Sequence, residues 1–147
     1  KNVVVIPTKT VAQGITALFS FSPDENFKDN ENAMLEAIAT VKTAEVTYAV
    51  RDTEIDGKII QKGDYMGIGN GHMIAVGNEV GYTTIETVKS MVSEDDELIT
   101  IYYGENVTSD EAARIAEILE EEIGNDELDI EVIFGGQPVY YYIVSVE

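Results

Sequence analysis

The sequence contains no cysteine and only one histidine, and these two shortages exclude several classes of site. Without cysteine, neither a disulfide framework nor a thiolate metal site can form. The single histidine, His72, has no second histidine or cysteine with which to share a metal ion. No apolar run approaches the roughly 18 residues that a membrane span needs. We therefore expect a protein without a transmembrane segment, and the cytoplasm is the expected compartment.

Basic residues are also scarce. The chain has nine lysines and arginines and 28 acidic residues, which gives a formal net charge of −19. A surplus of acid argues against nucleic acid as a partner. Residues 78–147 alone hold eighteen acidic and two basic residues. Such a charge can steer a basic partner towards a docking site. The simpler interpretation is that these carboxylates form solvated helix faces that keep the protein soluble.

The length of 147 residues, with 44% apolar and 25% charged residues, is typical of one globular domain or two small ones. The chain begins without methionine on the strand-like run of residues 3–6. We therefore expect it to be a piece of a longer protein.

Helices and strands alternate along the first half of the chain, which predicts an α/β or α+β fold. Residues 3–6 are β-branched or apolar and predict a strand, and Thr10 with Gln13 predicts a helix cap before residue 11. Asp29 or Asn30 is the expected cap of a second helix. From residue 45 to 77 the period changes to two, which predicts a four-stranded antiparallel meander over residues 46–51, 58–61, 65–68 and 72–76. Its tight turns are expected at Asp56-Gly57 and Asn70-Gly71.

The second half predicts a helix capped by Thr83 with Glu86, a buried strand over residues 98–103 and a helix capped by Thr108 with Glu111. Strands over residues 130–134 and 139–146 are expected to form a hairpin or bulged return around Gly135-Gly136-Gln137-Pro138. We divide the chain into residues 1–41, a strand and two helices that belong to a first subdomain, and residues 42–147, a mixed sheet with helices.

No motif predicts an active site, a cofactor site or a metal site in this chain. The run of residues 52–59 begins like a calcium-binding loop, but the twelfth loop position is Gly63 where a glutamate is required. The glycine-rich run 67–71 precedes a strand, whereas a phosphate-binding loop precedes a helix. Asp52, Glu54 and Asp56 alternate, and are expected on one strand face as an acidic ridge.

Three segments resemble a known family, in the order that the family has them, and together they cover essentially the whole chain. They are VVVIPTKTVAQG (residues 3–14), VTYAVRDTEIDG with KGDYMGI (residues 46–57 and 62–68), and GGQPVY (residues 135–140). They are similar to the C-terminal region of the kinase subunit of bacterial fatty acid kinase, a family also described as dihydroxyacetone kinase-like. The resemblance implies a fold related to the DegV proteins.

The resemblance implies that the complete kinase subunit has three domains. The N-terminal domain would bind ATP and magnesium, the middle domain would supply catalytic and dimerising residues, and the C-terminal domain would bind a separate DegV-type fatty acid carrier. The assembly phosphorylates the carboxylate of a bound fatty acid to give an acyl phosphate for phospholipid synthesis. On this basis the chain itself is expected to be non-catalytic and free of cofactors.

We hypothesise that acidic residues dock the carrier, with candidates chosen for charge and expected exposure: Asp52, Glu54, Asp56, Glu117, Glu120 and Glu121. Two alternatives stay open. The chain could be a dihydroxyacetone kinase-like or DegV-like domain that binds a small molecule or lipid, for which His72 is the one histidine available. It could also be a purely structural domain.

Overall fold

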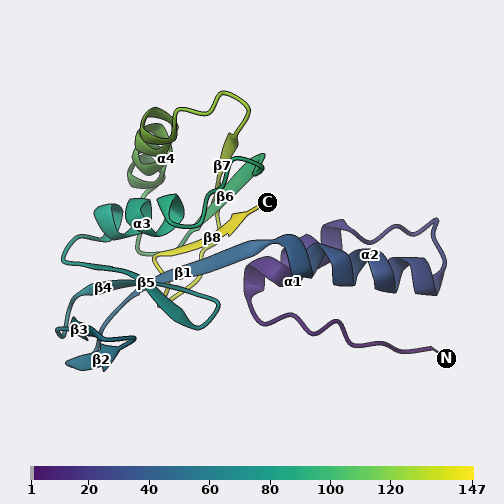
Figure 1. Cartoon of the computed structure of the whole chain (residues 1–147), viewed down its shortest axis with the longest axis horizontal. Helices are drawn as coiled ribbons and strands as arrows, with labels where there is room; N and C mark the ends of the chain where they lie inside the picture. Colours follow the sequence, from purple (N-terminus) through teal and green to yellow (C-terminus); the bar gives the residue numbers. More distant parts are fainter. Residues whose placement is uncertain (1) are drawn as a thin grey trace.

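A six-stranded mixed sheet organises the protein, and helices pack around it (Figure 1). The computed structural model describes residues 2–147. The elements are α1 (Val11–Phe19), α2 (Phe27–Thr40), β1 (Lys42–Tyr48), β2 (Thr53–Ile55), β3 (Lys58–Ile60), β4 (Tyr65–Gly69), β5 (His72–Gly77), α3 (Val80–Lys89), β6 (Leu98–Tyr103), α4 (Ser109–Ile123), β7 (Asp129–Phe134) and β8 (Tyr142–Val146). The predicted mixed α/β class is confirmed.

The strand order in the sheet is β5-β4-β1-β8-β6-β7, with only β6 and β7 parallel. The last strand of the chain, β8, therefore lies between β1 and β6, and the expected β7–β8 hairpin is wrong. All five residues of β8 are buried, so a central place in the sheet shields both of its faces from water. The strand also begins at Tyr142 rather than at the expected Val139.

The expected four-stranded meander is only partly correct. β1, β4 and β5 are antiparallel neighbours, but β2 and β3 leave the sheet as a separate two-stranded hairpin. These two strands have three residues each, and Ile60 anchors them by packing with Met66 and Met73. The two predicted tight turns are confirmed, because Asp56, Gly57, Asn70 and Gly71 all have φ between 52 and 78°.

Helices α3 and α4 form the main core against the sheet. The core contains Val46, Val88, Ile99, Leu119 and Val144, each with 0% of its surface exposed. Their burial removes apolar surface from water, which is the dominant favourable term in folding.

α3 approaches β4 very closely, because Gly67 has no side chain. A Cβ atom on Gly67 would lie 1.8 Å from the Thr87 hydroxyl oxygen. Thr83, the expected cap of this helix, instead lies buried inside it and donates its hydroxyl to the Glu79 carbonyl at 2.8 Å. The prediction failed because a threonine followed three residues later by glutamate also fits a helix interior whose hydroxyls bond to the preceding turn.

The N-terminal segment does not form the strand expected at residues 3–6. Val3 and Val5 are 84% and 82% exposed, and no strand of the described chain lies beside them to supply hydrogen bonds. The next prediction is correct, because the Thr10 hydroxyl accepts a hydrogen bond from the Gln13 N–H at the start of α1.

α2 begins earlier than expected, with Asn26 as its cap in place of Asp29 or Asn30. The side chain of Asn30 is buried and clamps the preceding loop, accepting from the Ser22 N–H at 2.7 Å and donating to the Ser22 carbonyl at 2.8 Å. Its bonding capacity is therefore used inside the fold rather than at the helix end.

Residues 2–41 hold the N-terminal segment, α1 and α2, while residues 42–147 hold the eight strands with α3 and α4. In Figure 1 the α1–α2 pair extends from the end of the sheet where β1 begins and β8 ends. Thr10 donates to Thr43 at 3.1 Å, and Thr16 donates to Glu147 at 2.5 Å. The division into two subdomains stays a prediction. Within residues 2–147, no helix combines the length and apolar character of a membrane span.

Candidate functional site

The three acidic candidates near the β2–β3 hairpin are all exposed, but they do not all lie on one strand. Only Glu54 lies within β2, whereas Asp56 occupies the tight turn. The carboxylate of Asp52 accepts the Lys62 N–H at 2.7 Å, and that of Asp56 accepts the Met73 N–H at 2.8 Å. Asp52 therefore closes the base of the hairpin and Asp56 ties its turn to β5, while all three side chains stay exposed to solvent. Their role in docking stays a prediction.

The other three candidates, Glu117, Glu120 and Glu121, are all exposed on α4. They lie opposite the buried face of the helix, which carries Ala112, Ile115, Ala116 and Leu119. The predicted capping box of this helix is confirmed, with reciprocal hydrogen bonds between Thr108 and Glu111. Figure 1 places α4 and the β2–β3 hairpin at opposite ends of the sheet region, so the two acidic groups do not form one patch.

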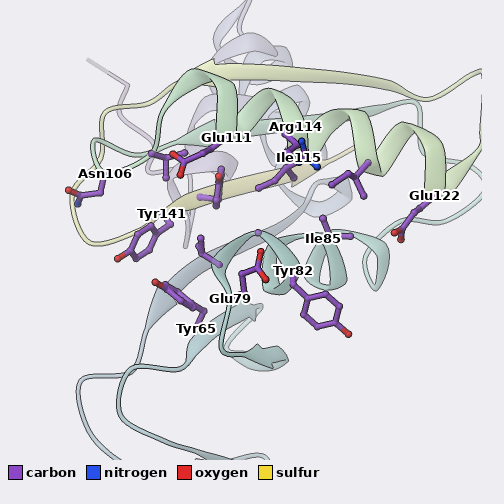
Figure 2. A pocket seen from close by; sticks show the side chains of 15 residues that line it. Tyr65, Glu79, Tyr82, Ile85, Asn106, Glu111, Arg114, Ile115, Glu122 and Tyr141 are labelled. Atoms are coloured by element: carbon purple, nitrogen blue, oxygen red, sulfur yellow. The ribbon is translucent and has the colours of Figure 1, made fainter.

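A groove of about 640 Å³ lies between α3 and α4 (Figure 2). Tyr82 and Ile85 line it from α3, and Arg114 and Ile115 line it from α4. At one end the rings of Tyr65 and Tyr141 pack edge-to-face, with centroids 5.3 Å apart and planes at 84°. Burial, followed by the proximity of Tyr65, raises the pKa of Tyr141 above its ordinary value.

Most charged residues of this groove are acidic. Hydrogen bonds from the backbone and side chain of Thr108 lower the pKa of Glu111 and keep it ionised. Glu79 stands at the start of α3, yet its side chain makes no capping hydrogen bond, so its carboxylate is available to another group. Glu122 bonds Lys89 at 2.6 Å and thereby links α4 to α3. Arg114 takes part in none of the ion pairs between described residues.

These features can receive a positively charged, partly apolar group from a partner. Carboxylates pair with Lys or Arg, and tyrosine rings attract a cation placed over their faces. The same carboxylates oppose a triphosphate, whose charge has their sign. This groove was not evident from the sequence. Its only signal was the run Tyr140-Tyr141-Tyr142, whose neighbours come from strands far away in the chain.

A second groove, of about 730 Å³, lies between the α1–α2 pair and the sheet. Leu35, Ile38 and Ile68 give it apolar walls. Burial raises the pKa of Glu45, which also lines it. An apolar chain fits the chemistry of these walls, but the Glu45 carboxylate would oppose a second carboxylate nearby.

The single histidine gains a neighbour that the sequence did not reveal. Nδ1 of His72 lies 3.7 Å from a carboxylate oxygen of Asp56, and the histidine side chain is 79% exposed. The separation exceeds a hydrogen bond, so the carboxylate does not orient the ring. Within the described chain, no three His, Asp or Glu side chains converge as metal ligands would.

Known proteins with similar sequences are C-terminal parts of longer chains. A family model for the C-terminal region of FakA-like fatty acid kinase subunits matches residues 1–147. Protein YloV of Bacillus subtilis (strain 168) is 46% identical over 147 residues, which are 100% of this chain and 26% of that protein. Uncharacterized protein SH1689 of Staphylococcus haemolyticus is 39% identical over 146 residues, which are 99% of this chain and 26% of that protein. Uncharacterized protein SAUSA300_1119 of Staphylococcus aureus is 36% identical over 144 residues, which are 98% of this chain and 26% of that protein. The chain thus spans about a quarter of the length of these relatives.

Proposed function

Because the chain belongs to the family of FakA-like C-terminal domains, we propose that it is the non-catalytic docking domain of a bacterial fatty acid kinase. Its partner is the DegV-type protein that carries the fatty acid. In this proposal ATP and magnesium bind in another domain, the kinase subunit dimerises through its middle domain, and the assembly works in the cytoplasm. The product is an acyl phosphate.

The acidic surplus is the observation that carries the proposal. Residues 78–147 contain eighteen acidic and only two basic residues. Three of the acidic residues, Glu117, Glu120 and Glu121, lie on the exposed side of α4. A basic carrier would be attracted to this field and would associate faster at low ionic strength. Exposed charges are screened over about 10 Å at 0.1 M salt, so the attraction should weaken as salt rises.

Sedimentation of the purified domain with its DegV-type carrier, at low and at high salt, tests the proposal. We expect a complex that weakens with salt. The variant Glu117→Lys/Glu120→Lys/Glu121→Lys should weaken binding by about tenfold or more at low salt, because it replaces attraction by repulsion. Glu54→Lys tests the hairpin without breaking the hydrogen bonds that Asp52 and Asp56 make to the backbone.

The matched control reverses charges at a distant site. Asp24 and Glu25 are exposed in the loop between α1 and α2. Asp24→Lys/Glu25→Lys changes the net charge by four units, against six for the triple variant on α4, and should leave affinity close to wild type. No complex at either salt would contradict the docking role. Normal carrier binding by a full-length kinase chain that lacks this domain would instead support a purely structural role.

One observation favours a second candidate, a DegV-like domain that itself binds lipid. The groove between the α1–α2 pair and the sheet has about 730 Å³ and apolar walls at Leu35, Ile38 and Ile68. Mass spectrometry of the purified domain under non-denaturing conditions tests this candidate. A co-purifying acyl chain that is lost on Ile38→Glu substitution would support it, and a protein of unmodified mass would count against it.

A further inference from the structure

The segment of residues 135–141 contains a strained turn in an unusual place. The N–H of Tyr140 donates to the carbonyl of Pro138 at 2.8 Å, which closes a three-residue turn around Val139. Val139 has φ of 72°, so this is the rare form of the three-residue turn. A β-branched residue at positive φ is a true conformational outlier. Such strain persists only where the surrounding structure imposes it.

The fold gains little from the valine side chain itself. Val139 is 61% exposed, so its methyl groups contribute little to the core. Glycine or asparagine would adopt the same backbone with less strain. Folding stability therefore does not explain a strained, exposed valine at this position, whereas contact with another molecule would explain it.

Hydrogen bonds on both sides of the turn hold it in place. The Val139 carbonyl accepts a hydrogen bond from the Thr47 hydroxyl at 3.0 Å, and the Tyr141 N–H donates to the Val46 carbonyl at 2.8 Å. The Gln137 side-chain amide donates to the Tyr102 carbonyl at 2.9 Å, and the Gly104 N–H donates to the Tyr141 carbonyl at 2.9 Å. A turn fixed in this way needs little further ordering when a partner binds, which favours affinity.

Tyrosine rings continue the surface from the turn into the α3–α4 groove. Tyr48 follows Thr47 directly, is 44% exposed, and packs edge-on against Tyr141 with centroids 6.2 Å apart. Tyr141 in turn packs against Tyr65, and both of these residues line the groove beside Glu79 (Figure 2). Tyrosine is enriched at the energetic centres of protein interfaces, because its rigid ring buries a large area.

We propose that Val139, Tyr48 and Tyr141 form the apolar anchor by which this domain binds its carrier protein. The inference rests on the proposed docking function and assigns the contact surface. The partner is expected to present a shallow apolar recess bordered by Lys or Arg. Charge complementarity selects this occupant, because Glu79 and Glu111 line the groove next to the tyrosines in a chain of net charge −19. The acidic residues attract the carrier, and the anchor retains it.

The test measures affinity and thermal stability of the same variants of this domain. Val139→Gly removes the side chain and relieves the strained backbone, so we expect an unchanged or higher melting temperature together with an affinity for the carrier at least about tenfold weaker. Tyr48→Ala should weaken binding to a similar extent. Val5→Gly is the matched control, since Val5 is 82% exposed in the N-terminal segment.

The outcomes separate this inference from the proposed function. If the wild-type domain binds the carrier and the Val139 and Tyr48 variants bind equally well, the inference is wrong while the docking function stands. If the wild-type domain does not bind at either salt, both are overturned. Val139→Asn is a second variant in case Val139→Gly does not fold, because asparagine also adopts the positive φ of this position. A folded Val139→Asn protein with wild-type affinity, or a variant that changes only self-association of the domain, would also overturn the anchor.

Discussion

Replacing Gly104 by alanine should destabilise the protein strongly, because two backbone carbonyls occupy the space that a side chain needs. A Cβ atom there would lie 2.4 Å from the Tyr140 oxygen and 2.7 Å from the Gln137 oxygen. Ordinary carbon–oxygen contact begins near 3.4 Å. The segment of residues 135–141 would therefore have to retreat by about 1 Å from the end of β6. Neither carbonyl can turn aside as a flexible side chain would.

The size of the effect follows from two contributions. Overpacking a tight site costs about 1–3 kcal/mol. The retreat also stretches the 2.9 Å hydrogen bond from the Gly104 N–H to the Tyr141 carbonyl, and its loss adds about 1 kcal/mol. We therefore expect a decrease of about 2–4 kcal/mol in the free energy of unfolding, or roughly 4–16 °C in melting temperature for a domain of this size.

Gly14→Ala is the matched control, because the same chemical change should act in the opposite direction. Gly14 lies inside α1, and nothing is within 4 Å of the position that a Cβ atom would take. Alanine favours a helix interior over glycine by about 0.5–1 kcal/mol, so this variant should be slightly more stable than wild type.

Urea unfolding followed by far-ultraviolet circular dichroism, with tyrosine fluorescence as a second probe, measures both variants. Coincident transitions and an unchanged slope would show that the unfolding free energy itself has changed. Wild-type stability of Gly104→Ala, or equal shifts of both variants in the same direction, would show that the two carbonyls do not obstruct a side chain at this position.

Two further predictions concern the core and pH. Leu119→Ala should lower the free energy of unfolding by about 2–5 kcal/mol in urea titrations, because Leu119 is fully buried between α4 and the sheet, whereas Glu117→Ala on the exposed face should change it by less than about 0.5 kcal/mol. Burial alone would raise the pKa of Asp96, but hydrogen bonds from Lys42 and Ser93 outweigh it, so the pKa is lowered overall. The folded state then gains stability above the unfolded pKa of about 3.9 and loses it as pH falls through the lower folded pKa. Asp96→Asn should therefore lower the free energy of unfolding by about 1.5–3 kcal/mol near pH 7. In unfolding titrations the difference in this free energy between variant and wild type should shrink below about pH 4. A difference that stays constant with pH would contradict this explanation.

Local chemistry was the most predictable part of the fold. The Thr108–Glu111 capping box and the turns at Asp56-Gly57 and Asn70-Gly71 follow from hydrogen bonds and backbone angles within a few residues. Predictions failed where a residue has a second use in the tertiary structure. Asn30 was expected to cap a helix but clamps Ser22, and Thr83 was expected to cap a helix but packs inside one.

Strand order could not be read from the sequence, because it depends on pairing between distant segments. β8 places Val144 between Ala44 of β1 and Ile101 of β6, and no periodicity within residues 142–146 indicates such partners. The charge of the candidate docking residues was evident from the sequence, but the hydrogen bonds that some of them make within the fold were not. The hydrogen bond of Asp56 to the backbone appears only when the hairpin is placed against β5, and that of Asp52 appears only when the two ends of the hairpin meet. The packing of the tyrosine rings could not be predicted for the same reason, since Tyr48, Tyr65 and Tyr141 come from three separate strands or loops.

The kinetics of binding can distinguish the two parts of the proposed interface, because they act at different stages. Rim charges mainly change the association rate and its salt dependence, whereas buried apolar contacts mainly change the dissociation rate. Reversal of Glu117, Glu120 and Glu121 should therefore slow association at low salt and lose its effect at high salt. Val139→Gly should speed dissociation at every salt concentration and leave the salt dependence of association unchanged. If both variants altered only association, the anchor would have no retaining role, and the carrier would be held by charge alone.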